Sequence, residues 1–140
     1  MTIMFVPILF VISIGVYGLQ SYWLAHQEAQ VCASSAALAG ASVLESASSN
    51  QAISIANTVG NTNQVQGKTA QLTITPGIVT GNNHSNFSFT ATDLNASPAP
   101  NALLVKAALD YNFIGINLKH VSVSAIARHT PNKRASYLIH

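Results

Sequence analysis

Side chains that could carry catalysis are scarce in this chain of 140 residues. Its four acids are Glu28, Glu45, Asp93 and Asp110. Catalysis by paired carboxylates needs two acids held close together, and nothing in this spacing brings two of them together. Glu28 and Glu45 lie more than four turns apart on one predicted helix, where we expect them to be solvated or to pair with a Lys or Arg of a neighbouring copy. The acids therefore predict no active site.

Motifs for metals and cofactors are also missing from the sequence. The single cysteine, Cys32, leaves no disulfide framework and no Cys-rich metal site, and the five histidines show no i, i+4 pair of ligands. Gly67-Lys68-Thr69 resembles the end of a phosphate-binding loop, but the earlier glycine of that motif falls on Thr62. The sequence has no G-x-S-x-G serine motif and no C-x-x-C-H haem motif. We therefore predict that the protein is not an enzyme and uses no cofactor and no metal.

The charges of the chain do not favour nucleic acid as a partner. Charged residues make up 7% of the sequence and the net charge is +2, which is too weak a field to attract a polyanion. Half of the basic residues lie in the tail Arg128–His140, for which a solvated segment that bridges subunits is favoured over a DNA-binding patch. N-x-S patterns at Asn83, Asn86 and Asn95 indicate an exposed loop, and their glycosylation stays an open question.

The elements that hold these side chains begin with an apolar segment, Ile3–Leu24. It contains no charged residue over 22 positions, and as a helix it would span roughly 33 Å, enough for a bilayer core. A proline falls in its first two turns, where the missing N–H costs least, and aromatic rings gather near its end, as at a membrane–water boundary. We expect this segment to lie in a membrane or in a filament core. The residues predicted for that role are Ile3, Phe5, Pro7, Leu9, Phe10, Ile14, Tyr17 and Trp23.

A run of small residues follows the apolar segment. Residues 26–48 include no proline and are mostly small or good helix formers, so the helix is predicted to continue to about Ser49 or Asn50. Small side chains recur at helical spacing, and the pair Ala36 and Gly40 would let another backbone approach closely. The predicted helix-packing stripe consists of Ala25, Ala29, Cys32, Ala36, Gly40, Val43 and Ala47.

Such a helix of 40-odd residues would be roughly 60 Å long, too long to be buried against one small domain. It must be anchored in lipid, packed on copies of itself, or both in turn. Two interpretations stay open: a single-pass anchor whose stem holds a domain off the membrane, and a helix built to pack in a filament core. A cleavable signal peptide fits less well, because a charged n-region is missing and the apolar run is long. Since membrane insertion normally uses flanking Lys or Arg, we expect that a basic leader has been removed and that Met1 is the mature start.

The second half of the chain alternates as β-strands do. The clearest strand is 119–128, in which every second residue from Val121 to Ala127 is apolar. The segment 102–111 fits a helix or a buried strand by its period, and a strand is favoured. The remaining predictions are strands over 70–75, 78–80 and 86–92, a turn at Pro76-Gly77, a short helix over 51–59, and loops over 60–68 and 94–101.

Together these elements predict an α+β fold. Four or so antiparallel strands give a sheet with one apolar face, and the natural cover for that face is the polar half of the long helix. The expected organisation is an N-terminal membrane or filament-core helix over residues 1–50 and a small β-rich exported domain with a basic tail over residues 51–140.

The helix also carries a resemblance to a known family. Gln30 and the block Ala36-Ala37-Leu38-Ala39-Gly40-Ala41 are similar to the start of the TadE/TadG-like proteins of the tight-adherence, or Flp, pilus system. That family closes with a strand of the form F-x-G followed by V-x-V-S-A. Here Phe113-Ile114-Gly115 and Val121-Ser122-Val123-Ser124-Ala125 resemble it.

The chain departs from this family pattern at three places. The family usually has an Asp before the alanine block, where this chain has Ser34 or Ser35. An acidic residue that is common after the apolar run is absent, with Gln20 nearby. Typical type IV pilins carry a glutamate near the mature N-terminus, and this chain has Phe5 instead.

The resemblance implies a membrane-inserted precursor that acts in, or assembles into, a bacterial surface pilus. We expect a structural, pilin-like subunit that polymerises through its apolar helix into an extracellular pilus used for attachment. Its expected partners are copies of itself, membrane lipid before assembly, and an inner-membrane assembly machinery, with no nucleic acid. Two alternatives stay open: a membrane-anchored assembly component that does not polymerise, and an adhesin module whose loops around residues 82–100 contact a ligand.

Overall fold

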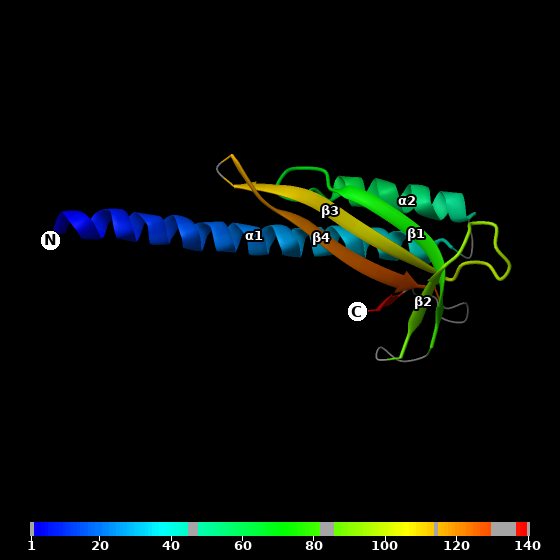
Figure 1. The fold of residues 1–140 in the computed structure, drawn as a ribbon. Helices are drawn as coiled ribbons and strands as arrows, with labels where there is room; N and C mark the ends of the chain where they lie inside the picture. The colour runs from blue at the N-terminus through cyan, green and yellow to red at the C-terminus, as the bar shows by residue number, and fades with distance from the viewer. Residues whose placement is uncertain (1, 45–47, 82–85, 114, 130–136, 140) are drawn as a thin grey trace.

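The computed structural model describes residues 2–44, 48–81, 86–113, 115–129 and 137–139. Over these residues the chain forms a long helix, a shorter helix and an antiparallel sheet that lies along the second half of the long helix (Figure 1). The N-terminal half of the long helix projects beyond the sheet (Figure 1). The elements are α1 (Thr2–Ser42), α2 (Ser49–Thr62), β1 (Gln71–Thr80), β2 (Ser88–Ala91), β3 (Ala102–Phe113), β4 (Ile116–Arg128) and β5 (Tyr137–Ile139).

The five strands form one antiparallel sheet in the order β2-β1-β3-β4-β5. The hairpin of β3 and β4 is its centre, paired from Ala102 and Arg128 at one end to Phe113 and Ile116 at the tip. The predicted α+β fold, a long helix packed on a small antiparallel sheet, is confirmed. The segment 102–111, which also fitted a helix by its period, is part of strand β3.

The sheet has one apolar face, and the two helices cover it. Helix α1 packs against β3 and β4, while α2 packs against α1 and β1. On β4, Val121, Val123, Ala125 and Ala127 are buried and the serines between them are exposed, as the alternation predicted. The basic tail is not wholly solvated as expected, because β5 pairs with β4 and buries Ile139.

Helix α1 ends earlier than predicted. Its last residue is Ser42, and α2 begins at Ser49 with Ser48 as its N-cap. The Ser48 side chain accepts a hydrogen bond from the Gln51 backbone N–H at 3.4 Å, and the Gln51 side chain accepts one from the Ser48 N–H at 3.3 Å. This reciprocal capping box starts a new helix, so the prediction that one helix continues to Ser49 or Asn50 is wrong. The helix predicted over 51–59 is confirmed and is longer at both ends.

The turn predicted at Pro76-Gly77 is also wrong, because β1 runs without interruption through both residues. The Pro76 carbonyl accepts a hydrogen bond from the Thr92 N–H at 3.1 Å, so the polar backbone edge of Pro76 faces the end of β2 and not β3. The N–H that proline lacks would also point to that edge, so its absence leaves the pairing of β1 with β3 intact. A Cβ at Gly77 would overlap the Phe89 ring of β2, which explains a glycine inside this strand.

Candidate functional site

The N-terminal half of α1, residues 5–24, has an apolar surface that the described part of the chain leaves exposed except near its C-terminal end, where the tip of the β3–β4 hairpin lies against it. Leu19 is 72% exposed and Phe10 is 68% exposed, on different sides of the helix. By length and composition α1 could cross a membrane. A helix that is apolar all round is stable only in surroundings as apolar as itself, which means lipid or other helices. We call residues 5–24 the projecting half and residues 25–42 the packed half of α1.

The residues predicted for a membrane or filament core lie on the projecting half. The only polar side chain in its first three turns is that of Ser13, whose hydroxyl donates to the Leu9 carbonyl at 2.8 Å and so is satisfied within the helix. The side chain of Ile3 lies outside the described part of the structure. The others, all exposed, are Phe5, Pro7, Leu9, Phe10, Ile14, Tyr17 and Trp23.

The predicted helix-packing stripe lies on the packed half and faces the chain's own fold. Ala25, Cys32 and Ala36 are fully buried and Ala29 nearly so. A Cβ at Gly40 would overlap the Leu103 side chain of β3 and lie 3.0 Å from the Ala52 carbonyl oxygen of α2. The close approach expected for another backbone is therefore occupied by α2 and the sheet of the same chain. Val43 follows the helix in a half-buried turn, and Ala47 lies outside the described residues.

One side-chain hydrogen bond ties the packed half to α2. The Cys32 thiol donates to the Gly60 carbonyl oxygen at 3.2 Å. Burial of this thiol within the folded domain raises the pKa of Cys32, so the thiol keeps its proton and acts as a donor rather than as a nucleophile. The contact is close because Gly60 has no side chain: a Cβ there would overlap Leu72 and lie 3.3 Å from the Ala36 Cβ.

The C-terminal end of the projecting half meets the tip of the β3–β4 hairpin at a seam of aromatic rings. The ring centroids of Tyr17 and Phe113 lie 6.0 Å apart, and those of Tyr22 and Tyr111 lie 5.9 Å apart in an edge-on arrangement. Gly18 permits the approach of the tip, because a Cβ there would lie 3.3 Å from the Phe113 ring. The sequence gave no signal that the hairpin tip would return to the helix at this level.

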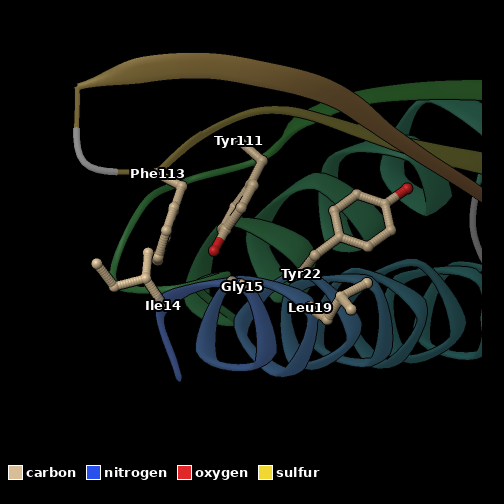
Figure 2. A pocket seen from close by; sticks show the side chains of 7 residues that line it. Ile14, Gly15, Leu19, Tyr22, Tyr111 and Phe113 are labelled. Carbon is tan, nitrogen blue, oxygen red and sulfur yellow. The ribbon is translucent and has the colours of Figure 1, made fainter. Parts of the chain in front are cut away.

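A pocket of about 410 Å³ lies at this seam (Figure 2). Its walls are almost entirely apolar, and its floor is a helix surface with two glycines. Figure 2 shows Tyr111 reaching from the hairpin toward α1, with its hydroxyl near the turn at Gly15, while the Tyr22 hydroxyl points away. The lining residues are Ile14, Gly15, Gly18, Leu19, Tyr22, Tyr111 and Phe113.

Two acids, Glu28 and Asp110, and the phosphate-loop-like segment serve local structure. Glu28 accepts a hydrogen bond from the Gln66 N–H at 2.7 Å, which ties α1 to the tight turn formed by Val65 and Lys68. Asp110 pairs with His120 at 2.8 Å across the exposed side of the central hairpin. Across the described residues, no group of three or more His, Cys, Asp or Glu side chains could hold a metal ion.

Comparison with known proteins agrees with the resemblance of the helix. Residues 1–43 match the family model described as Flp pilus-assembly TadE/G-like. This match includes both halves of α1 and ends where the helix ends, so the sheet domain lies outside it. No curated protein and no solved structure matches the chain. The similarity indicates a pilus-related role for a chain with a membrane-type helix.

Proposed function

We propose that this chain is a structural, pilin-like subunit that polymerises through the projecting half of α1 into a surface pilus. The observation that supports this most is the apolar surface of residues 5–24, most of which the described part of the chain leaves exposed. In the membrane, lipid would cover it before assembly. In a fibre, the same surface on neighbouring copies would cover it, with the sheet domains on the outside.

The sequence suggested that the small residues of the packed half would contact another helix, but in the proposed fibre they have a different role. Its small-residue stripe is buried against β3, β4 and α2 of the same chain, so it fixes the direction of the projecting half relative to the sheet. A rigid connection of this kind would let every copy present the same helix surface at the same angle, which a regular helical assembly requires.

The test is electron microscopy of surface fractions sheared from cells of the native source. Fibres that contain this chain support the proposal, and a chain confined to the membrane fraction overturns it. A photo-crosslinking residue in place of Phe10, which is 68% exposed, sharpens the test. Polymerisation predicts adducts between copies in the sheared fraction. The same probe at Lys106, which is exposed on the face of the sheet away from α1, is the control and should give no adducts between copies, because the proposal places the sheet domains on the outside.

The second candidate is a membrane-anchored assembly component that does not polymerise. The description of the matching family as a pilus-assembly family favours it. This alternative predicts that the probe in place of Phe10 crosslinks to lipid or to other membrane proteins, and that no crosslinked oligomers of the chain form. Deletion of the chain would then abolish fibres that are built from a different subunit.

A further inference from the structure

One of the N-x-S patterns of the sequence forms an exposed turn in the fold. Asn95, Ala96 and Ser97 belong to the loop between β2 and β3, and the side chains of Asn95 and Ser97 are exposed. The Ala96 N–H donates to the Asp93 carbonyl at 3.0 Å, which closes a β-turn with Asn95 at one of its two central positions. The Asn95 amide therefore lies at the tip of a turn, where another molecule can reach it.

The Asn95 side chain has no structural role among the described residues. It forms no hydrogen bond with them, although asparagines in turns often bind the neighbouring backbone. Asn101, at the other end of the same loop, shows the contrast. Its side chain accepts a hydrogen bond from the Val79 N–H at 2.8 Å and donates one to the Val79 carbonyl at 3.2 Å, so it fastens the loop to the sheet. Asn101 is needed for the fold, whereas Asn95 is free to react.

The backbone around Asn95 can also move without disturbing the sheet. The loop is held at its start by the Thr92 N–H, which donates to the Pro76 carbonyl, and at its end by the Asn101 N–H, which donates to the Gly77 carbonyl. Between these two points the turn supplies the one backbone hydrogen bond found among the described residues. An enzyme that takes up this segment has only that bond to break.

The neighbouring pattern at Asn86 is less accessible to an enzyme. The Asn86 side chain is exposed, but Phe87 packs against the apolar cluster of Val79 and Ile139, and Ser88 is the first residue of β2 and pairs with Thr80. Uptake of this segment would pull β2 away from the sheet. The pattern at Asn83 lies outside the described residues. Of the two patterns that the structure describes, the fold favours Asn95.

The loop between β2 and β3 lies far from the surface proposed for assembly. In Figure 1 it forms the yellow-green end of the molecule, opposite the N-terminus of α1. A bulky group attached to this loop would leave residues 5–24 free to contact lipid or other helices. If the sheet domains form the outer wall of a fibre, the same group would face the surroundings of the cell.

We propose that Asn95 is the acceptor of an N-linked glycan, added by an oligosaccharyltransferase after export of the sheet domain. The Asn95 side-chain nitrogen attacks the anomeric carbon of an oligosaccharide carried on a lipid pyrophosphate, and a C–N bond forms. The bond from that carbon to the pyrophosphate oxygen breaks, the lipid pyrophosphate leaves with the electron pair, and the amide proton passes to a base of the transferase. Ser97 supplies the hydroxyl that the acceptor pattern requires two positions after the asparagine. The proposal rests on export, which is one part of the proposed function, and not on polymerisation.

The test is mass spectrometry of the full chain and of its proteolytic peptides, isolated from cells of the native source. The chain should be heavier than its sequence by the mass of an oligosaccharide, and fragment spectra should place that mass on Asn95. Asn95→Gln should lose the added mass completely. Asn86→Gln is the matched control, because it makes the same substitution in the neighbouring pattern, and it should keep the added mass in full.

A second pair of variants tests the recognition of the pattern while leaving the acceptor in place. Ser97→Ala removes the hydroxyl and should lose the added mass, whereas Ser97→Thr keeps a hydroxyl and should retain it. Because both side chains are exposed, neither change should alter the fold, and unchanged hydrogen-exchange protection of β3 amides checks this.

The results separate this proposal from polymerisation. Fibres built from a chain of unmodified mass would overturn glycosylation and leave the pilin proposal standing. A chain that carries the glycan but is confined to the membrane fraction would do the reverse. A glycan on Asn83 or Asn86 with Asn95 unmodified would also overturn the proposal, since the fold would then not select the acceptor.

Discussion

The two halves of α1 share one backbone conformation and have opposite surroundings. The projecting half carries large apolar side chains that are mostly exposed, whereas the small side chains of the packed half that face the sheet and α2, such as Ala25, Ala33 and Ala36, are fully buried. Leu19 is 72% exposed, while Ala36, less apolar and five turns further along, is fully buried. Hydrophobicity alone would predict the opposite, with the leucine buried and the alanine exposed.

The difference shows that side-chain size decides which part of this helix enters the fold. Small residues let α1 lie close to the sheet and to α2, so that Gly40 touches Leu103 and Ala36 lies near Gly60. Dispersion forces and burial then act over the whole contact. Large residues over the projecting half would hold a neighbouring element too far away for such packing, and they suit lipid or other helices instead.

The largest expected effect on stability comes from comparing Leu→Ala at two places. One is on β3, where the strand packs against the packed half, and the other is on the projecting half. Leu103 on β3 is fully buried against Gly40, so Leu103→Ala leaves a cavity and should lower the free energy of unfolding by about 3 kcal/mol. Leu19→Ala should change it by less than about 0.5 kcal/mol, since Leu19 is mostly exposed within the chain. The measurement is urea unfolding in detergent micelles, followed by hydrogen exchange of β3 amides. Equal losses for the two variants would break the comparison.

Two glycines on the same helix give the next effect. A side chain at Gly40 collides with Leu103 and approaches the α2 backbone, so Gly40→Leu should destabilise the fold by about 2–3 kcal/mol through overpacking. A Cβ at Gly15 meets nothing within 4 Å, and Gly15→Leu should leave unfolding unchanged or slightly favour the helix. Thermal unfolding followed by near-ultraviolet circular dichroism measures both. A stable Gly40→Leu variant would mean that α1 does not lie as close to the sheet as described.

A smaller effect is expected from two serines that make hydrogen bonds at different places. Ser48 caps α2, the helix that covers the packed half, and Ser48→Ala should cost about 1 kcal/mol of stability. Ser13 on the projecting half bonds only within its own helix, and Ser13→Ala should change stability by no more than a few tenths of a kcal/mol. Urea midpoints of the two variants test this. A Ser13 effect as large as that of Ser48 would mean that the projecting half also supports the fold.

Most of the architecture was predictable because it depends on local periodicity. The alternation from Val121 to Ala127 and the unbroken apolar segment 3–24 each depend on neighbouring residues alone, and both predictions of structure are confirmed. The break between α1 and α2 was missed because its signal is a pair of side chains, Ser48 and Gln51, inside a run of small residues that also favours helix.

The candidate site was only partly predictable, for a different reason. The sequence marked the small residues as a packing stripe, but the identity of the packing partner is a property of the fold, which places α2 and the sheet there. Likewise Tyr111 and Gly15 are 96 positions apart, and only the length of the β3–β4 hairpin brings them to one pocket. Contacts of this range leave no pattern in a single sequence.

The smallest expected effect concerns the seam, where the end of the projecting half meets the hairpin tip. Tyr17 and Phe113 approach with ring centroids 6.0 Å apart, and a double-mutant cycle with alanine at both positions should give a coupling of about 0.5–1 kcal/mol. Trp23 stacks on His26 of its own helix, so the matched cycle of Trp23 with Phe113 should give no coupling. Hydrogen exchange of amides at the hairpin tip reports each free energy. Because Tyr17 is 65% exposed and belongs to the projecting half, a clear coupling would show that even a mostly exposed side chain of this half contributes to the fold. A coupling no larger than that of the Trp23 cycle would instead leave Tyr22, whose ring meets Tyr111, as the aromatic contact of the projecting half with the hairpin.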